Sequence, residues 1–177
     1  MDPREASSRG PSTRCARPVP TARASLATRA SPIRILAFPR LVITACTGHG
    51  VAAGCFIQLP ADLRLGADGP FQIGLNEVKI GLTMPRFVIE LARPRLTPSH
   101  FDRAVNSAVM YAPGDAVAAG FLDRVGPAEE LQSMALEAAK ELAGLSAEAH
   151  KATKLKTRAG LIDAVHTAID EEFNALR

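Results

Sequence analysis

The chain has 177 residues, 47% of them hydrophobic and 22% charged, which is the composition of a globular domain large enough for one core. The formal net charge of +3 arises in residues 1–40, which carry eight Arg against two acidic residues, so it does not indicate a nucleic-acid-binding surface on the rest of the chain. No apolar run reaches the roughly 18 residues of a membrane span, and three Cys without metal-type spacing favour a reducing, cytoplasmic location and predict no metal site.

Residues 1–38 are predicted to be a disordered tail. Residues 1–32 are rich in Arg, Ser and Pro, are nearly free of acidic residues, and show no apolar periodicity. An organellar transit peptide is the functional alternative, because such peptides are also rich in Arg and Ser. The recurring prolines argue against the amphipathic helix that targeting requires. A third explanation is that this segment is not native coding sequence.

Residues 39–126 are predicted to form an α/β core, and residues 127–177 a helical region. Alternating or continuous apolar runs predict strands, and capping residues, prolines and apolar spacing of three or four predict helices. The expected strands are 41–46, 62–67, 71–75 and 121–125; the expected helices are 51–59, 86–92, one from Pro98, one from Asp115 to Gly120, one from Pro127 and one from Ser146.

The glycine-rich corner between residues 46 and 53 is the first candidate site. A strand, a glycine turn and a helix start place free N–H groups at the positive end of a helix dipole, which suits an anion or a developing anion. Read as G-x-G-x-x-A with Asp68 following, the corner also matches a dinucleotide-binding fingerprint. The helix before Pro60 is short for the βαβ crossover that this fingerprint needs. Close helix-to-strand packing is the purely structural alternative.

Several motifs after residue 46 occur in the order found in one enzyme family. The stretch TGHGVAAGC, then ADLRL, then FQIGLNEVKIGLTMP, and later AVAAGFLDRV, resembles the signature of the crotonase (enoyl-CoA hydratase/isomerase) superfamily over about residues 39–177. The resemblance implies a crotonase spiral fold that is incomplete at its N-terminus, either truncated or mis-started. Residues 1–40 show no counterpart of the family's A-G-A-D loop, which supplies one of two oxyanion N–H donors.

The resemblance implies a site for an acyl-CoA thioester. In the family, two backbone N–H groups stabilise the enolate oxygen, and the position of one donor corresponds to Ala53. Gly50 and Gly54, in the same loop, are expected to take part in oxyanion or substrate binding. No separate cofactor is implied, because coenzyme A is part of the substrate. The helical residues 127–177 are expected to build a homotrimer or a dimer of trimers.

Glu77 is the expected catalytic residue. Family hydratases use two glutamates, but the first position is Phe56 here, and a phenyl ring neither takes a proton nor orients water. The segment Ile73–Glu77, IGLNE, is similar to that of the Δ3-Δ2-enoyl-CoA isomerase branch, in which this glutamate is the lone base. Isomerisation by a single proton shuttle is therefore expected, with a pKa raised by burial. Hydration, a catalytically impaired CoA-binding protein, and an exposed turn glutamate are the alternatives.

The remaining candidates are weaker. His49 is expected to be a structural part of the corner, and Cys46 and Cys55 to be small core residues. Lys154 and Lys156 lie in a basic cluster that could contact CoA phosphates. A solvated helix face is the alternative for that cluster.

Overall fold

The computed structural model describes residues 31–174. The elements after the opening helical segment of residues 31–36 are β1 (Ile43–Cys46), β2 (Gly50–Val51), α2 (Ala53–Gln58), β3 (Leu63–Ala67), β4 (Ile73–Gly74), the 3₁₀ helix η1 (Val78–Ile80), α3 (Arg86–Ala92), α4 (Pro98–Val105), α5 (Pro113–Ala119), β5 (Arg124–Gly126), α6 (Leu131–Ala143) and α7 (Ala147–Asn174). The tail or targeting segment expected in residues 1–30 lies outside the described residues.

Two small parallel sheets organise the chain. The first has the strand order β1-β3-β5, with Ala45 opposite Leu65 and Leu65 opposite Arg124. The second pairs β2 with β4, so that Gly50 lies opposite Ile73. All three strand pairs are parallel, and the central β3 is mostly buried, as expected where helices cover a sheet. The α/β class predicted from the sequence is confirmed.

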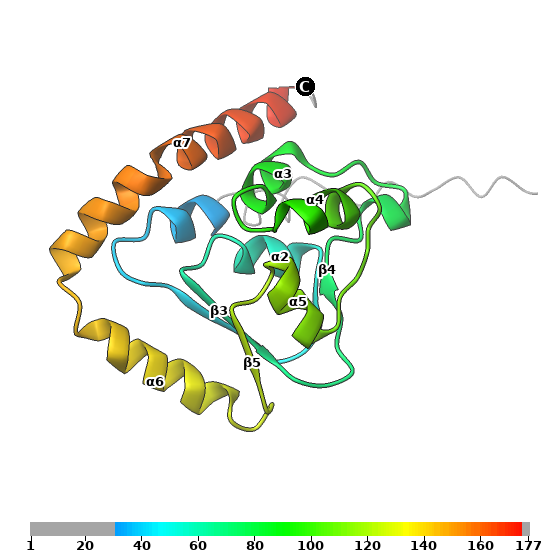
Figure 1. Ribbon diagram of the computed structural model, residues 1–177. Helices are drawn as coiled ribbons and strands as arrows, with labels where there is room; N and C mark the ends of the chain where they lie inside the picture. The colour runs from blue at the N-terminus through cyan, green and yellow to red at the C-terminus, as the bar shows by residue number, and fades with distance from the viewer. Residues whose placement is uncertain (1–30, 175–177) are drawn as a thin grey trace, which may run out of the picture.

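Helices cover the sheet on two sides (Figure 1). The side chains of Leu65 and Ala67 pack with Leu131 of α6 in a small apolar cluster. A larger cluster joins α2, α3, α4, α5 and α7 and includes the fully buried Leu91 and Val165. In Figure 1, α6 and α7 run along the outside of the molecule, and α7 ends beside α3. None of the helices described is both long and apolar enough to cross a membrane.

Residues 31–38 correct the predicted boundary of the tail. Residues 31–36 form a helical segment, and Leu36 is 0% exposed within the larger core. Ile33 packs against the same core. The tail prediction rested on polar and Arg-rich composition, but the apolar residues at the end of this segment fold onto α7 and the core. The disordered assignment is therefore wrong for residues 31–38.

Three predicted boundaries shift for local hydrogen-bonding reasons. α6 begins at Leu131 and not at Pro127, because the N–H of Glu130 closes a turn onto the carbonyl of Pro127 at 3.0 Å. β5 begins at Arg124, because the N–H groups of Phe121 and Leu122 return to the end of α5. α5 begins at Pro113, which places Asp115 in its first turn and not at its cap.

Candidate active site

The glycine corner folds as a strand-to-helix turn with one unusual backbone conformation. Ala52, the N-cap residue of α2, has φ 51° and ψ −116°, a region that L-residues other than glycine rarely adopt. The N–H of Ala52 donates to the carbonyl of Gly74 at 3.1 Å. This bond continues the pairing of β2 with β4, so the corner and the IGLNE segment lie side by side.

The first turn of α2 presents the donor groups expected of an oxyanion site. Ala53 and Gly54 are the first two residues of the helix, so their N–H groups have no acceptor within it. Ala53 is exposed and Gly54 is half-buried. Both N–H groups lie at the positive end of the helix dipole, which favours a developing negative charge. The N–H of Ala53 therefore has the surroundings that its expected role requires.

The structure shows a packing role for Gly50. Its N–H donates to the carbonyl of Gln72 at 2.9 Å, so it is not available to a substrate oxygen. A Cβ at Gly50 would lie 2.7 Å from Nε2 of Gln58 and 3.0 Å from Cδ1 of Ile73. The thiol of Cys55 donates to the carbonyl of Gly50 at 2.8 Å. Gly50 thus lets β2 and α2 pack closely, and its part in substrate binding stays a prediction.

Glu77 lies near the corner as a buried, incompletely paired carboxyl group. It precedes η1 by one residue, is 5% exposed, and its Oε2 has no hydrogen-bond partner. Burial raises the pKa of Glu77, although its own backbone N–H and that of Asn76 oppose the shift. Burial likewise raises the pKa of Cys55, in α2, to about 12, and the charges of Cys46 and Glu77 add to that effect.

Phe56 is the residue that the sequence resemblance matches to the first glutamate of the hydratases. Its side chain is 7% exposed and packs edge-on against Phe87 of α3, with ring centroids 5.7 Å apart. The surroundings are apolar, because both rings belong to the larger core. Glu77 is therefore the carboxylate that the described part of the corner offers for proton transfer.

The other residues of the corner hold its shape. Nδ1 of His49 accepts the N–H of Gln72 at 3.0 Å, and the imidazole packs edge-on against Phe71. The thiol of Cys46 donates to the carbonyl of Gly48 at 3.2 Å. His49 and the two cysteines are thus placed as structural groups. Within residues 31–174, no three His, Cys, Asp or Glu side chains gather as a metal site.

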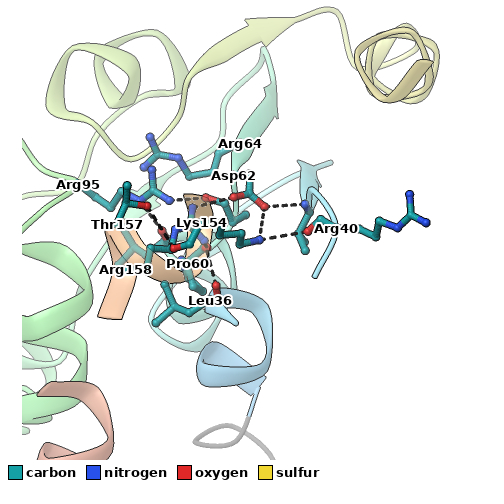
Figure 2. A network of polar contacts seen from close by, with 12 residues as sticks. Leu36, Arg40, Pro60, Asp62, Arg64, Arg95, Lys154, Thr157 and Arg158 are labelled. Carbon is teal, nitrogen blue, oxygen red and sulfur yellow. Dashed lines mark hydrogen bonds and ion pairs between the residues drawn. The ribbon is translucent and has the colours of Figure 1, made fainter. Parts of the chain in front are cut away.

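Two residues of the basic cluster of α7, Lys154 and Arg158, form a partly buried network of ion pairs. Lys154 is 5% exposed, and its Nζ donates to Asp62 at 2.6 Å and to the carbonyl of Arg40 at 3.2 Å. Arg158 is half-buried and donates to the other oxygen of Asp62 at 2.8 Å (Figure 2). Lys154 therefore neither faces a CoA phosphate nor lies on a solvated face, whereas Lys156 is exposed. Sequence reasoning missed this network, because ion pairs between distant segments leave no local pattern.

Comparisons with known proteins agree with these motifs. The family model described as enoyl-CoA hydratase/isomerase matches residues 17–176. The human protein named enoyl-CoA delta isomerase 1, mitochondrial, is 29% identical over 133 residues, which are 75% of this chain and 44% of that protein.

Solved structures show the same similarity. An enoyl-CoA hydratase/isomerase family protein from Pseudomonas syringae is 50% identical, with a TM-score of 0.81 over 82% of this chain and 63% of the other. The enoyl-CoA hydratase EchA3 from Mycobacterium ulcerans is 40% identical, with a TM-score of 0.77 over 81% of this chain and 62% of the other. The chain thus spans less than two thirds of each of these three relatives. Its motifs, fold and matched length together place it in one family: the chain belongs to the enoyl-CoA hydratase/isomerase family of the crotonase superfamily.

Proposed function

We propose that this protein moves the double bond of a 3-enoyl-CoA thioester into conjugation with the thioester carbonyl. The N–H of Ala53 is the oxyanion donor that the chain supplies, and Glu77 is the base. The human relative is named as an enoyl-CoA isomerase, which supports the same reaction class here. Coenzyme A enters as part of the substrate, so the reaction needs no separate cofactor.

The proposed reaction is a proton shuttle without net oxidation or reduction. The ionised carboxyl group of Glu77 removes a proton from C2, and the electrons of that C–H bond form a dienolate whose charge rests on the thioester oxygen. The Ala53 N–H stabilises this oxygen by a hydrogen bond that strengthens as the charge develops. Protonated Glu77 then returns the proton to C4, which leaves the double bond between C2 and C3.

The environment of Phe56 is the observation that carries this proposal. Hydration requires groups that hold and deprotonate water, and the apolar contact between Phe56 and Phe87 leaves no second carboxylate at that position. A single buried carboxyl with a raised pKa suits a shuttle instead, because it can both take and return a proton near neutral pH. Hydration is the second candidate, because the similar Mycobacterium ulcerans structure is titled a hydratase.

The test compares two reactions in the wild type and in Glu77→Gln. A 3-enoyl-CoA is followed by the absorbance of the conjugated product, and a 2-enoyl-CoA by the loss of that absorbance on hydration. We expect isomerisation by the wild type and at least a 10³-fold lower kcat in Glu77→Gln, because the base is lost. Equal rates would refute the role of Glu77, and faster hydration than isomerisation would favour the second candidate. Binding of acyl-CoA in calorimetry without turnover would indicate a non-catalytic binder.

The helical region of α6 and α7 remains proposed as a homotrimer interface. Leu136 on α6 and Leu155 on α7 are 56% and 40% exposed, and Leu145 between the helices is 54% exposed. Exposed leucines on neighbouring helices are available for contacts between subunits. Light scattering that gives the mass of a monomer at micromolar concentration would refute this proposal.

A further inference from the structure

We propose that Arg95 and Arg158 are positioning residues for the N–H donor at the start of α2, acting through the carbonyl groups at the end of that helix. The inference rests on the proposed function of this corner. It adds to that function two residues from distant parts of the chain, one following α3 and one in α7.

Because α2 is short, a displacement of one of its ends also displaces the other. The helix has six residues, Ala53–Gln58, and at 1.5 Å per residue it is about 9 Å long. A helix this short has no stability of its own and takes its position from its contacts. A shift at its C-terminal end therefore changes the direction of the N–H groups at its N-terminal end.

Two arginines hold three consecutive carbonyls, that of the C-cap residue of α2, Leu59, and those of the two residues that follow the helix. Arg95 donates from Nε to the carbonyl of Leu59 at 2.9 Å and from a terminal nitrogen to the carbonyl of Ala61 at 2.5 Å. Arg158 donates to the carbonyl of Pro60 between them at 3.1 Å (Figure 2). Carbonyls at a helix C-terminus lack intrahelical partners, and cations there interact favourably with the dipole.

The charges of the cluster leave it with an excess of positive charge. Three cations, Arg95, Lys154 and Arg158, lie near the carboxylate of Asp62, and the neighbouring ion pair of Arg64 and Asp123 adds one charge of each sign. Burial, together with the nearby charges of Arg64 and Arg158, lowers the pKa of Arg95 to about 10. The positive excess is offset by the backbone carbonyls at the end of α2. The same excess contributes a positive potential along the helix toward the developing oxyanion.

Arg158 also connects the site to the C-terminal helix. It bonds both to Pro60 and to Asp62, and Asp62 in turn accepts the N–H of Val42 at 2.7 Å. α7 has 28 residues and contributes Lys154 to the same carboxylate one turn earlier. The position of α7 on the core is therefore coupled to the position of α2.

The test uses the full chain labelled with ¹⁵N and three variants, Arg95→Gln, Arg158→Gln and the matched control Arg103→Gln, whose side chain is exposed on α4. In the free protein we expect the amide resonances of Ala53 and Gly54 to move in the first two variants and not in the control. With 3-enoyl-CoA we expect kcat to fall about 10–100-fold and KM to change less than about threefold, because a misplaced donor weakens transition-state contacts more than ground-state binding.

Each outcome decides the proposal. Arg158→Lys is expected to recover part of kcat, because it keeps a cation at the carbonyl of Pro60. Should a glutamine variant fail to fold, the lysine variants at positions 95 and 158 replace it, and they are expected to move the same two amide resonances by a smaller amount. Unchanged resonances of Ala53 and Gly54, together with a lowered melting temperature, would show a merely structural role and overturn the proposal. A wild type without turnover would refute the proposed function, while the amide resonances of the free protein would still decide the positioning role.

Discussion

The N–H of Ala52 donates to the carbonyl of Gly74, and this one bond fixes the distance between the two halves of the candidate site. Ala52 precedes the donor residue Ala53, and Gly74 lies three residues before Glu77. The single S–H of Cys55 is shared between the carbonyl of Gly50 at 2.8 Å and that of Gly74 at 3.2 Å. The base and the oxyanion donor are therefore positioned by the same short pair of strands.

Ala52→Gly is expected to stabilise the protein. Ala52 has φ 51°, which is strained for alanine and unstrained for glycine. The relief exceeds the entropy that glycine adds to the unfolded chain, so we expect the free energy of unfolding to rise by about 1 kcal/mol. Urea unfolding measures this change. The matched control, Ala159→Gly in the exposed middle of α7, is expected to lower the free energy of unfolding by about 1 kcal/mol. If both variants lost stability, the backbone of Ala52 would not be strained.

Glu77→Gln is expected to raise thermal stability at neutral pH while it abolishes isomerisation. The pKa of Glu77 is raised in the folded state, so between its unfolded and folded pKa the folded protein holds a proton that the unfolded chain has lost. The free energy of unfolding therefore falls as the pH rises through this window. Glutamine does not titrate, so Glu77→Gln avoids this fall in the free energy of unfolding. We expect its melting temperature at pH 7 to be higher than that of the wild type by about 2–4 °C.

Calorimetry from pH 4 to pH 8 checks whether the free energy of unfolding falls with rising pH, as a raised pKa of Glu77 requires. The difference between the wild type and Glu77→Gln should grow with rising pH and then become constant, and a difference that shrinks would contradict a raised pKa. The same ionisation controls activity, because only the carboxylate accepts a proton from C2. The kcat/KM of the wild type should therefore fall on acidification at a pH above the ordinary glutamate pKa.

Local patterns predicted most elements of the fold. The alternation of apolar residues in β3, the proline at the start of α4 and the serine before α7 each act within a few residues, and each element was found. Ser146 caps α7 as predicted, with its Oγ accepting the N–H of Ala149 at 3.4 Å. The candidate site was predicted from the family resemblance, which could be seen because the motifs around Ala53 and Glu77 are contiguous.

Interactions across the chain could not be predicted. Lys154 and Asp62 are 92 residues apart, and each looks like an ordinary surface residue in its own segment. The N–H of Gly50 looks available until it is seen to pair with Gln72. Leu36 belongs to the core only because later helices fold over a segment whose neighbours are rich in Arg. In each case the deciding partner is distant in sequence.

Phe56→Glu is expected to destabilise the protein without creating a hydratase. The side chain is 7% exposed and packs against Phe87, so a carboxylate there would be buried without a partner. We expect the free energy of unfolding to fall by about 3 kcal/mol or more, whereas the control Phe56→Leu should cost about 1–2 kcal/mol. Chemical denaturation measures both, and assays with 2-enoyl-CoA test hydration. Efficient hydration by a stably folded Phe56→Glu would show that the pocket accepts a second carboxylate.

Asp62→Asn is expected to detach α7 from the sheet. The side chains of Asp62 and Lys154 are 8% and 3% exposed, so the neutral amide leaves a buried ammonium without its counterion. Removing one partner of a buried ion pair costs about 3–5 kcal/mol, and we expect a loss near the lower value because asparagine retains one acceptor oxygen.

The control Asp163→Asn on the exposed side of α7 should change the free energy of unfolding by less than about 0.5 kcal/mol. The double variant Asp62→Asn/Lys154→Met should recover part of the loss, because it removes the more deeply buried of the two cations that pair with Asp62, while Arg158 keeps the carbonyls of Pro60 and Leu36. Hydrogen exchange should show faster exchange along α7 in Asp62→Asn; equal exchange in α7 and a loss below about 1 kcal/mol would show that apolar packing against α3 holds the helix without this ion pair.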